Sequence, residues 1–392
     1  MKYEVIIIGT GQAAIATAMT LRQNKFEGSI LMIGNEDHLP YQRPPLSKAF
    51  LKDEITEDRL YLKSASYFSK NKIEILSGTN VEEINLRDRS VSIANNNFIY
   101  QKLVLCTGSS FKKIKNISNE EKIHYLRTIE DAKKIKSEIN GSNKILILGG
   151  GYIGLEIASV AALKGLQVTL IETEDRLMRR SVCKKTASFI QKKHEEKGVN
   201  FLFNTTIDNI EDYEGSKRII YENKAIDFDS VIIGVGIKPN ENLAKSAGLS
   251  CQNGIIVNEF GQTIDQNVYS AGDCTNHPSK VYNKRLRLES VQNAVDQGKI
   301  VASSILGIKK EYAQVPWFWS EQYDLKIQIA GLSHEYDDCI IQEDSHYGRF
   351  LAYYLLNNKL VAADAINSQK EFLKAKKLIS SKSTINRDIL IG

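Results

Sequence analysis

Val5-Ile-Ile-Ile-Gly9-Thr-Gly11-Gln-Ala13-Ala14, close to the amino end of a 392-residue chain, is the most informative segment of the sequence. Its β-branched start is long enough for one buried strand, and the small residues after Gly11 continue as a helix would. The pattern is a G-x-G-x-x-G/A turn: Gly9 permits the tight bend, Gly11 lets a pyrophosphate approach the backbone, and Ala14 packs helix on strand. The free N–H groups of the helix start suit a phosphate. This segment therefore predicts a dinucleotide-binding βαβ unit.

The same pattern occurs a second time, in the middle of the chain. Residues 144–148 predict a strand, and Gly149-Gly-Gly151-Tyr-Ile153-Gly154 predicts the turn. Residues 155–164 predict an amphipathic helix, and the next strand ends at Glu172. An acid at this place accepts a hydrogen bond from a ribose 2′-hydroxyl. Two complete units predict two dinucleotide sites.

Glu172 also bears on which nicotinamide cofactor is bound. A carboxylate accepts hydrogen bonds from two ribose hydroxyls but repels a 2′-phosphate, which favours NADH over NADPH. Arg176, Arg179 and Arg180 lie shortly after it, and arginines can accommodate that phosphate. NADPH therefore stays open as the less favoured alternative.

Polar residues after two other predicted strands are further candidates. An acid after the apolar run 30–33 should hold an adenosine ribose, and Glu36 is preferred over Asn35 and Asp37. After residues 268–270, the carboxylate of Asp273 can reach a polyol such as the ribityl chain of a flavin. It can equally cap a helix, since Asp favours that position.

Two more segments suit close passage of a ligand. The apolar run 103–105 leads into Thr107-Gly108, and the run 231–233 leaves through a glycine pair that ends at Gly236. Three of the six prolines lie within residues 39–48, which predicts an extended, stiff loop. That loop carries Arg43 and Lys48, which can present cations to a phosphate or a ring system. The alternative is a rigid surface connector.

Composition excludes several classes of protein. Hydrophobic residues make up 42% of the chain and charged residues 25%, which is ordinary for a soluble globular protein. No apolar run reaches the roughly 18 residues of a membrane span, and the short run before Gly9 is not a secretory signal. The five cysteines and six histidines are dispersed, which predicts no metal site and fits a reducing cytoplasm.

The charge of the chain is modestly basic. Its net charge is +5, and the segment 368–392 holds six basic residues against two acidic ones. The segment is interpreted as a solvated helix face, with a docking patch for an acidic partner as the alternative. No nucleic-acid reader motif accompanies the charge, so we expect no nucleic-acid partner.

These features predict an α/β fold with two Rossmann-like dinucleotide-binding domains, as in glutathione reductase, and a small C-terminal α+β domain. The expected domains are residues 1–112 and 240–312 for the first dinucleotide, which the resemblance described below implies to be FAD, 113–239 for NAD, and 313–392 for the C-terminal domain. Both tryptophans lie in Pro316-Trp317-Phe-Trp319-Ser320, interpreted as core or interface packing. A small antiparallel sheet and a helix around residues 372–379 complete the last domain.

With these residues in view, the chain resembles the FAD-dependent ferredoxin and rubredoxin reductases that supply Rieske oxygenases and cytochromes P450. The resemblance covers essentially the whole length. Its most specific elements are Pro40-Tyr-Gln-Arg-Pro-Pro-Leu-Ser-Lys48, Leu126-Arg-Thr128, Gly149-Gly-Gly-Tyr-Ile-Gly-Leu-Glu156, Ala271-Gly-Asp273, Leu288-Glu-Ser-Val-Gln-Asn-Ala294 and Pro316-Trp-Phe-Trp-Ser320. The sequence departs from the family in Phe111-Lys-Lys113, where an arginine is frequent after the glycine, which puts a cofactor contact there in doubt.

The resemblance implies the cofactors and their ligands. The residues implied to hold FAD are Gly9, Gly11, Ala13, Ala14, Glu36, Arg43, Lys48, Val81, Thr107, Gly108, Arg127, Asp273, Val291, Gln292 and Trp319. The residues implied to hold NADH are Gly149, Gly151, Ile153, Gly154, Glu156, Glu172, Thr173, Arg180 and Gly236. Val291 and Gln292 would open a helix whose positive end suits anionic reduced flavin, and Trp319 would lie beside the isoalloxazine ring.

The implied activity is hydride transfer from NADH to flavin, followed by two single-electron transfers to a [2Fe-2S] ferredoxin. Lys48 and Glu156 would both lie near the flavin although they come from different predicted domains. We predict that they form an ion pair that shields flavin N5 until NADH displaces it. Head groups farther apart than about 6 Å would contradict this pair.

The positions of the cysteines exclude two related classes of enzyme. Disulfide reductases and peroxidases of this fold need cysteines shortly after the first unit, and residues 35–60 contain none, so electrons should leave to an external acceptor.

Three alternatives stay open, which concern the acceptor, the type of flavoprotein and the oligomeric state. That acceptor can be a rubredoxin or a nitrite reductase in place of a ferredoxin. The chain can also be an NADH-sensing flavoprotein that resembles apoptosis-inducing factor. A monomer and a homodimer are equally compatible with the sequence.

Overall fold

The computed structural model describes residues 1–94, 96–115, 117, 120–344 and 347–384. Its contacts divide the chain into two compact units. Unit 1 comprises residues 1–42, 57–110 and 238–316, and unit 2 comprises residues 43–56, 111–237 and 317 onward. Two of the boundaries between these ranges, after residues 110 and 237, fall within β7 (Ser109–Phe111) and β16 (Ile237–Pro239).

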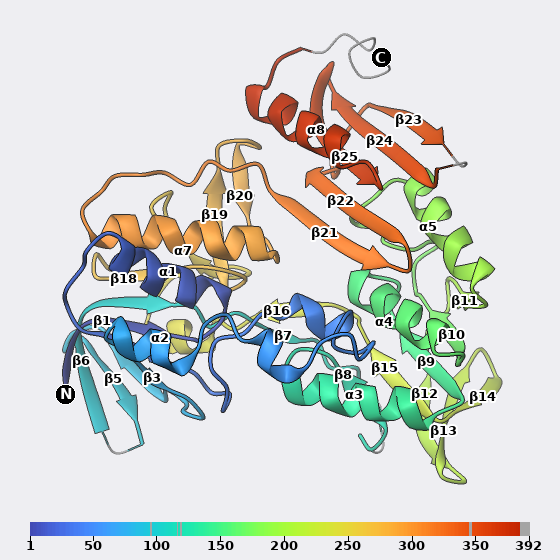
Figure 1. Ribbon diagram of the computed structural model, residues 1–392, viewed down its shortest axis with the longest axis horizontal. Helices are drawn as coiled ribbons and strands as arrows, with labels where there is room; N and C mark the ends of the chain where they lie inside the picture. The colour runs from blue at the N-terminus through green and yellow to red at the C-terminus, as the bar shows by residue number, and fades with distance from the viewer. Residues whose placement is uncertain (95, 116, 118–119, 345–346, 385–392) are drawn as a thin grey trace. The chain divides into compact units, whose positions relative to one another are not determined.

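A mixed sheet forms the centre of unit 1 (Figure 1). Its strand order is β3-β2-β1-β6-β5-β4, and β18 also pairs with β6. Neighbours among β3, β2, β1, β6 and β18 are parallel, whereas β4, β5 and β6 form an antiparallel meander. The strands are β1 (Lys2–Ile8), β2 (Ile30–Ile33), β3 (Ile73–Leu76), β4 (Glu83–Asn85), β5 (Ser90–Ile93), β6 (Asn96–Leu105) and β18 (Val268–Ser270).

Two helices of unit 1 pack closely on one another and on this sheet. They are α1 (Gln12–Gln23) and α7 (Val291–Ile305), which lie side by side in Figure 1. A Cβ added at Gly298 of α7 would stand 2.5 Å from the carbonyl oxygen of Ala13, so only glycine allows this approach. The smaller elements of unit 1 are α2 (Ala65–Lys70), α6 (Asn242–Ser246), β17 (Ile255–Ile256), β19 (Thr275–Ser279), β20 (Lys284–Leu286) and a 3-10 turn (Glu57–Leu60).

Unit 2 contains a second parallel sheet of the same kind, with strand order β11-β10-β9-β15-β8. Its apolar core includes Leu146, Leu148, Val231 and Ile233. The elements are β8 (Ile123–Tyr125), α3 (Ile129–Gly141), β9 (Lys144–Leu148), α4 (Tyr152–Leu163), β10 (Gln167–Ile171), α5 (Lys184–Glu196), β11 (Asn200–Leu202), the meander β12 (Asn209–Tyr213), β13 (Ser216–Tyr221) and β14 (Lys224–Phe228), and β15 (Ser230–Ile233). The repeated glycine pattern therefore corresponds to a repeated fold.

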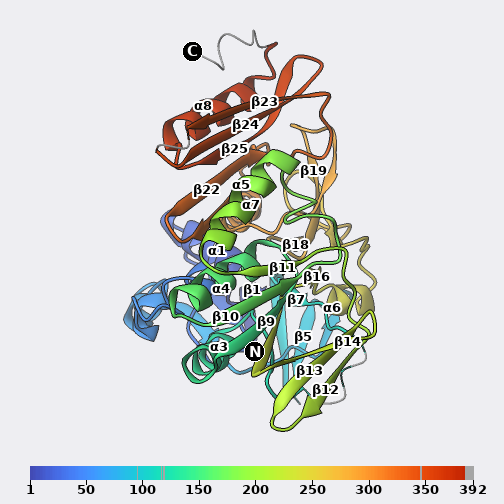
Figure 2. The same cartoon turned by 90° about the vertical axis from the view of Figure 1, so that its right-hand side faces the viewer.

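The last part of unit 2 is an antiparallel sheet of five strands in the order β21-β22-β25-β24-β23 (Figure 2). Helix α8 contacts β22 and β25, while α5 contacts β24 and α4 contacts β21. The elements are β21 (Trp317–Gln322), β22 (Leu325–Gly331), β23 (Asp338–Asp344), β24 (Arg349–Leu356), β25 (Lys359–Ile366) and α8 (Gln369–Ser381). The α/β class and the C-terminal α+β part predicted from the sequence are confirmed.

The proline-rich loop differs from its prediction. Residues Pro44–Ser47 form a 3-10 turn, and Arg43 before it has helical dihedral angles (φ −80°, ψ −32°). The fixed φ of proline suits the first position of a helical turn as well as an extended chain. The loop is therefore stiff but not extended throughout.

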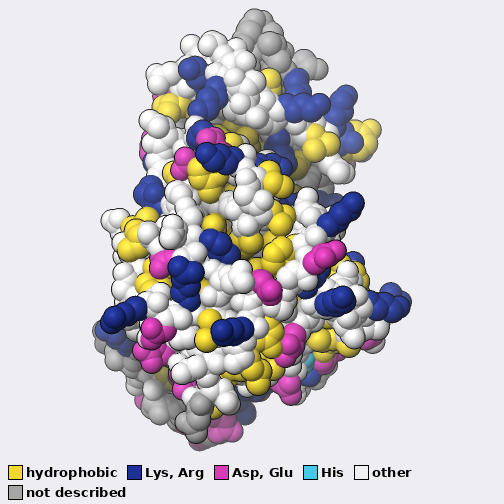
Figure 3. Space-filling model, turned by 90° about the vertical axis from the view of Figure 1, so that its left-hand side faces the viewer, with side chains coloured by type: hydrophobic (Ala, Val, Ile, Leu, Met, Phe, Trp, Pro, Cys, Tyr) yellow, Lys and Arg dark blue, Asp and Glu magenta, His cyan; other side chains and the backbone are white. Residues whose placement is uncertain are grey.

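Among the described residues, no helix is long and apolar enough to cross a membrane. On the face shown in Figure 3, lysine and arginine side chains are interspersed with acidic and apolar ones.

Candidate functional site

The first glycine turn lies where the sheet of unit 1 reverses its strand order. Strand β1 pairs with β2 on one side and β6 on the other, so ligands are expected beyond its carboxyl end. Gly9 follows β1 with φ +116°, and a Cβ there would be 2.1 Å from the carbonyl oxygen of Cys106. A Cβ on Gly34, after β2, would be 2.4 Å from the hydroxyl of Thr10. Gly9 is therefore required by close backbone approach, whereas Gly34 leaves room for the Thr10 side chain.

The start of helix α1 is open to a ligand. Gly11 is its N-cap, no side chain caps the helix, and a Cβ on Gly11 would meet nothing within 4 Å. The first N–H groups of a helix need acceptors, and an anion can supply them. Ala13 and Ala14 are buried, and a Cβ on Gly272 would lie 3.1 Å from the Cβ of Ala13. The residues before Asp273 therefore lie against the first turn of α1.

The other residues predicted for unit 1 surround this end of the sheet. Tyr41 donates a hydrogen bond to the carboxylate of Glu36, and Asp273 accepts one from Ser109 at 2.8 Å. Thr107 donates to the carbonyl of Asn240, whose amide donates back to the Thr107 carbonyl, which holds Gly108 in a fixed loop.

Asp273 does not cap the following helix. Ser290 does so: its hydroxyl accepts the N–H of Asn293, and Val291 and Gln292 form the first turn of α7. Val81 lies at the margin of the unit 1 core, half-buried.

The second glycine turn repeats this geometry in unit 2. Gly149 follows β9 with φ +103°, and a Cβ there would be 2.6 Å from the carbonyl oxygen of Gly234, after β15. Gly154 lies inside α4, where a Cβ would be 2.2 Å from the Gly149 carbonyl. Gly151 is the N-cap of α4, with open space around it and no capping side chain. Ile153 in the first turn of α4 is 40% exposed, unusual for a large apolar residue.

Glu172 lies directly after β10 and contacts the glycine turn. Its Oε2 accepts the N–H of Gly150 at 2.7 Å, and its Oε1 accepts from the Thr173 hydroxyl at 3.2 Å and the Glu174 N–H at 3.0 Å. These donors hold the carboxylate at the turn. A negative charge is thus fixed where the ribose of a dinucleotide is expected.

The three arginines that follow Glu172 have different surroundings. Arg176 donates to the carbonyls of Leu177, Val182 and Arg179 and thereby holds the loop. Arg179 pairs with Asp175 at 3.4 Å. Arg180 lies close to Gly236, whose added Cβ would be 3.8 Å from its Nη2.

A buried ion pair joins the proline-rich loop to helix α4. Lys48 Nζ is 2.7 Å from Glu156 Oε2, and the two residues are 8% and 1% exposed. Lys48 also donates to the Pro44 carbonyl at 3.3 Å, and the Ser47 hydroxyl donates to the same carboxylate oxygen of Glu156. The predicted ion pair is confirmed, and both partners belong to unit 2.

A chain of buried hydrogen bonds leads away from Glu156. Ser320 donates to Glu156 Oε1 at 2.6 Å, and Gln322 Nε2 donates to Ser320 at 3.1 Å. Gln322 Oε1 is 3.0 Å from His194 Nε2, and His194 Nδ1 is 3.2 Å from the Tyr323 hydroxyl. Since an ionised carboxylate only accepts, every donor points towards Glu156, which places the His194 proton on Nε2. Burial lowers the pKa of His194 to about 4, so the ring is neutral near pH 7.

Two further cations and the aromatic segment also lie in unit 2. Arg43 Nη1 donates to the Arg127 carbonyl at 2.6 Å, next to helix α3, whose N-cap Thr128 forms a capping box with Asp131. On β21, Trp319 lies beside Trp317 on one face, with ring centroids 5.6 Å apart, while Phe318 on the other face contacts Tyr152. All three aromatic residues of β21 are half-buried, so the segment is not deep core.

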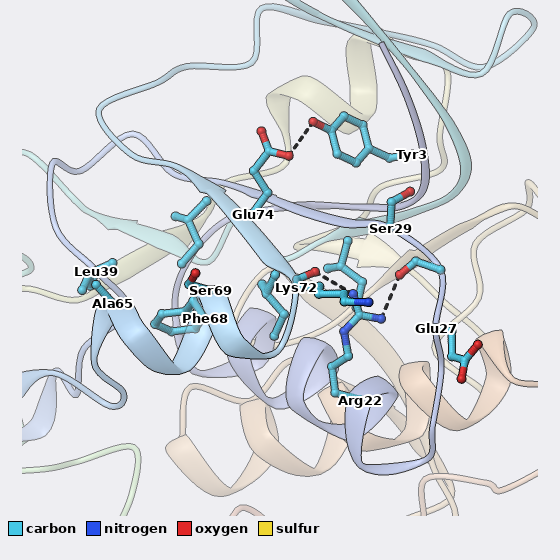
Figure 4. A pocket seen from close by; sticks show the side chains of 14 residues that line it. Tyr3, Arg22, Glu27, Ser29, Leu39, Ala65, Phe68, Ser69, Lys72 and Glu74 are labelled. Atoms are coloured by element: carbon cyan, nitrogen blue, oxygen red, sulfur yellow. Dashed lines mark hydrogen bonds between the residues drawn. The ribbon is translucent and has the colours of Figure 1, made fainter.

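A cavity of about 640 Å³ lies elsewhere in unit 1 (Figure 4). It is lined by the starts of β1 and β2, by α2 and β3, and by the loop after α1. Arg22 borders it and donates to the carbonyls of Phe26, Gly28, Asn71 and Lys72. This arginine therefore ties the loop to α2 and β3. The cavity is at the opposite end of the strands from Gly9 and is not part of the candidate site.

The residues present suit dinucleotide cofactors. Each unit has a glycine turn, an uncapped helix start at Gly11 or Gly151 and an acid, Glu36 or Glu172, after the next strand. Among the described residues, no group of three or more metal-ligating side chains exists.

Sequence reasoning did not find the hydrogen-bond chain of Ser47, Ser320, Gln322 and His194. Ser47 and Ser320 belong to two of the family motifs, but neither motif indicates a role for its serine. The polar residues Ser320 and Gln322 alternate along β21, a pattern that indicates a shared face. Nothing in the sequence indicates that His194 on α5 lies next to that face.

Comparisons with known proteins agree with this geometry. Residues 3–298 match the family model "Pyridine nucleotide-disulphide oxidoreductase", and residues 317–391 match "Reductase C-terminal". The chain is 37% identical to a ferredoxin–NAD(P)(+) reductase of Sphingomonas (98% of this chain, 94% of the relative). It is 34% identical to a rubredoxin–NAD(+) reductase of Pseudomonas putida (93% and 96%).

The solved structures include a similar fold. The reductase in the covalent putidaredoxin reductase–putidaredoxin complex superposes with a TM-score of 0.95 at 33% identity, over 99% of this chain and 95% of that chain. The family models match both glycine turns and the C-terminal sheet, and the relatives cover nearly the whole chain. The chain therefore belongs to the ferredoxin and rubredoxin reductases of the pyridine nucleotide-disulphide oxidoreductase family.

Proposed function

We propose that this protein is an NADH-dependent, FAD-containing reductase that supplies single electrons to a [2Fe-2S] ferredoxin. The observation that carries the proposal is the pair of equivalent glycine turns, each followed by an acid at the end of the next strand. One turn suits FAD in unit 1, and the other suits the nicotinamide dinucleotide in unit 2. Two such turns provide a separate dinucleotide site for each partner of a hydride transfer.

The FAD contacts proposed in unit 1 follow from its open helix start. The N–H groups at Gly11 would hold the pyrophosphate, Glu36 the adenosine ribose, and Asp273 the ribityl chain. The N-terminal turn of α7 would stabilise negative charge on the pyrimidine side of the flavin. When bound, FAD accepts the electron pair of NADH and can release it as two single electrons. Contacts of Arg43, Arg127 and Trp319 with FAD stay predictions.

The nicotinamide contacts proposed in unit 2 favour NADH. Glu172 presents a fixed carboxylate, Arg176 is engaged with backbone carbonyls, and Arg179 pairs with Asp175. Arg180 is the remaining cation that could meet a 2′-phosphate. Its place beside Gly236 suits the cofactor's pyrophosphate equally well.

Lys48 and Glu156 are proposed to act in the reaction as a charge pair. Glu156 would orient the carboxamide side of the nicotinamide, and Lys48 would move towards the flavin when NADH displaces it. Hydride transfer itself needs no acid, base or nucleophile from the protein. The pair's role is therefore to exclude water and to position charge.

The acceptor is tested by NADH-driven reduction of cytochrome c under anaerobic conditions, with and without a [2Fe-2S] ferredoxin. We expect a rate that depends on ferredoxin and falls with salt, because charge steering is screened above about 0.1 M. A rubredoxin serves as the second acceptor, since one relative is named for it. Reduction of the flavin by NADH with no rate gain from either carrier would reject the proposal.

The same experiment separates a second function. An NADH-sensing flavoprotein would reduce its flavin, form NADH-dependent dimers and pass electrons slowly. Size-exclusion chromatography with light scattering, with and without NADH, measures this and also decides between the expected monomer and homodimer. Cell fractionation tests the expected cytoplasmic location.

A further inference from the structure

The carboxylate of Glu156 is held from two different elements of unit 2. Its Oε2 accepts hydrogen bonds from Lys48 and Ser47, which both belong to the proline-rich loop. Its Oε1 accepts from Ser320 on β21 at 2.6 Å. In the function proposed above, NADH displaces Lys48, so the loop side releases the carboxylate. The bond from β21 does not depend on this loop and can keep Glu156 in place.

The direction of the Ser320 bond depends on Gln322. A serine hydroxyl has a single proton, so Ser320 donates to Glu156 only while no other acceptor takes that proton. Gln322 follows on the same face of β21, and its Nε2 donates to the Ser320 oxygen at 3.1 Å. A flipped amide would present Oε1 instead and would compete with Glu156 for the proton. The amide orientation of Gln322 therefore decides whether Glu156 keeps this donor.

His194 on α5 selects that orientation. Its Nε2 is 3.0 Å from Gln322 Oε1, and its Nδ1 is 3.2 Å from the Tyr323 hydroxyl. A neutral ring with its proton on Nε2 can accept from Tyr323 and donate to Gln322 at the same time. Both His194 and Gln322 are fully buried, so bulk water does not replace this donor. The ring thus holds the amide oxygen of Gln322 away from Ser320.

We propose that His194 is a positioning residue for Glu156. It acts through Gln322 and Ser320, whose hydroxyl stays directed at Glu156 Oε1 while the proline-rich loop lets go of Oε2. The inference rests on the proposed function, which gives this carboxylate its task of orienting the nicotinamide. Proton transfer along the chain is not part of the role, because the Gln322 amide is not a titratable group. The alternative role of His194 is to support only the packing of α5 on β21.

Two replacements of His194 differ in one hydrogen bond. The amide nitrogen introduced by H194Q reaches the place of Nε2 and keeps the donor to Gln322. The shorter side chain introduced by H194N places its amide near the position of Nδ1 and lacks that donor. S320A removes the last donor of the chain at Glu156. H334N is the matched control, because His334 is exposed.

The first measurement uses the oxidised holoprotein without NADH. Glutamate labelled with carbon-13 at its carboxylate gives a resonance for Glu156, identified because it is absent from E156D, a variant that keeps the charge of the ion pair. We expect S320A and H194N to shift this resonance in the same direction, whereas H194Q and H334N should leave it within its linewidth. A Glu156 resonance that H194N does not move would overturn the proposal.

The second measurement is the limiting rate of flavin reduction at saturating NADH in anaerobic rapid mixing. S320A should lower this rate about tenfold, since a hydrogen bond to a charged group is lost. H194N should lower the rate of the wild type, H194Q should recover most of that loss, and H194N should change the rate of S320A by less than about twofold.

Effects of H194N and S320A that multiply in the double variant would show that His194 does not act through Ser320, which would overturn the proposal. A wild-type flavin that NADH does not reduce would reject the proposed function instead. The Glu156 resonance is measured without NADH or a ferredoxin, so it decides the positioning role in either case.

Discussion

At the scale of single residues, Glu156 is the buried carboxylate around which the donors of the proposed charge pair gather. Its two carboxylate oxygens accept from Ser47, Lys48 and Ser320, and only 1% of the residue is exposed. A buried charge is tolerated only when donors surround it. Removal of one partner therefore leaves another charge unpaired.

Glu156→Gln should destabilise the protein by about 3 kcal/mol, because Lys48 would keep a buried charge without its partner. It should also slow flavin reduction by NADH in a rapid-mixing experiment. The matched control is Lys52→Gln in the same loop, which removes the exposed pair with Glu54 at 3.7 Å and should change stability by less than about 1 kcal/mol. Equal effects of the two variants would show that burial of the pair is unimportant.

Glu172 decides nicotinamide preference in our proposal. Glu172→Gln keeps the side-chain shape but removes the charge that repels a 2′-phosphate, so kcat/KM for NADPH should rise relative to that for NADH. A tenfold change in the ratio corresponds to about 1.4 kcal/mol. Glu174→Gln is the control, since Glu174 is exposed and contacts Glu172 only through its backbone. An unchanged ratio in Glu172→Gln would reject this role.

At the scale of elements, the two glycine turns separate folding from cofactor binding. Gly9 and Gly149 have positive φ angles and no room for a Cβ, whereas Gly11 and Gly151 have open space. The first pair is required by the strand-to-helix geometry. The second pair is free of that requirement, which is expected where a ligand approaches the backbone.

Gly11→Ala should therefore fold normally and lose FAD affinity, because the added methyl group would occupy the space of the pyrophosphate. Gly9→Ala should lose folded protein, since its Cβ would clash with the Cys106 carbonyl. Far-ultraviolet circular dichroism and titration of the apoprotein with FAD measure the two effects. Gly141→Ala is the control, because its Cβ would also meet nothing within 4 Å but lies at the end of α3. Retention of FAD by Gly11→Ala would contradict the assigned site.

At the scale of the whole molecule, buried titratable groups of opposite sign set the response to acid. Burial lowers the pKa of His194 and of His277 to about 4, and burial raises the pKa of Asp364 to about 7. Between about pH 6.5 and pH 4 the unfolded chain binds protons at both histidines that the folded protein does not bind, so the histidines lower stability as pH falls. Between about pH 7 and pH 4 folded Asp364 is protonated while unfolded Asp364 is not, so this residue raises stability as pH falls.

His194→Gln keeps an amide donor towards Gln322 and removes one titrating group. The loss of unfolding free energy between pH 6.5 and pH 4 should shrink by up to about 1.4 kcal/mol per pH unit. Urea unfolding at several pH values measures this slope. His334→Gln serves as the control because His334 is exposed. A slope equal to that of the wild type would mean that His194 binds a proton in the folded protein.

The sequence alone predicted the fold class, both dinucleotide units and the Lys48–Glu156 pair. Glycine turns can be recognised in a sequence because backbone sterics permit few other residues at positions such as Gly9 and Gly149. Strands such as β9 can be recognised because residues 145–148 are all apolar, as buried parallel strands are. The ion pair came from resemblance of whole motifs and not from periodicity.

Tertiary structure alone placed His194, Gln322 and Ser320 in one hydrogen-bond chain and brought Cys183 and Cys339 next to the same residue, Tyr354. These partners come from α5, β21 and β23, and no local rule of spacing connects elements so far apart in the chain. Their contacts depend on how the C-terminal sheet packs on α4 and α5. Local sequence patterns predict backbone geometry and burial. Contacts between side chains of different elements depend on how the whole unit packs.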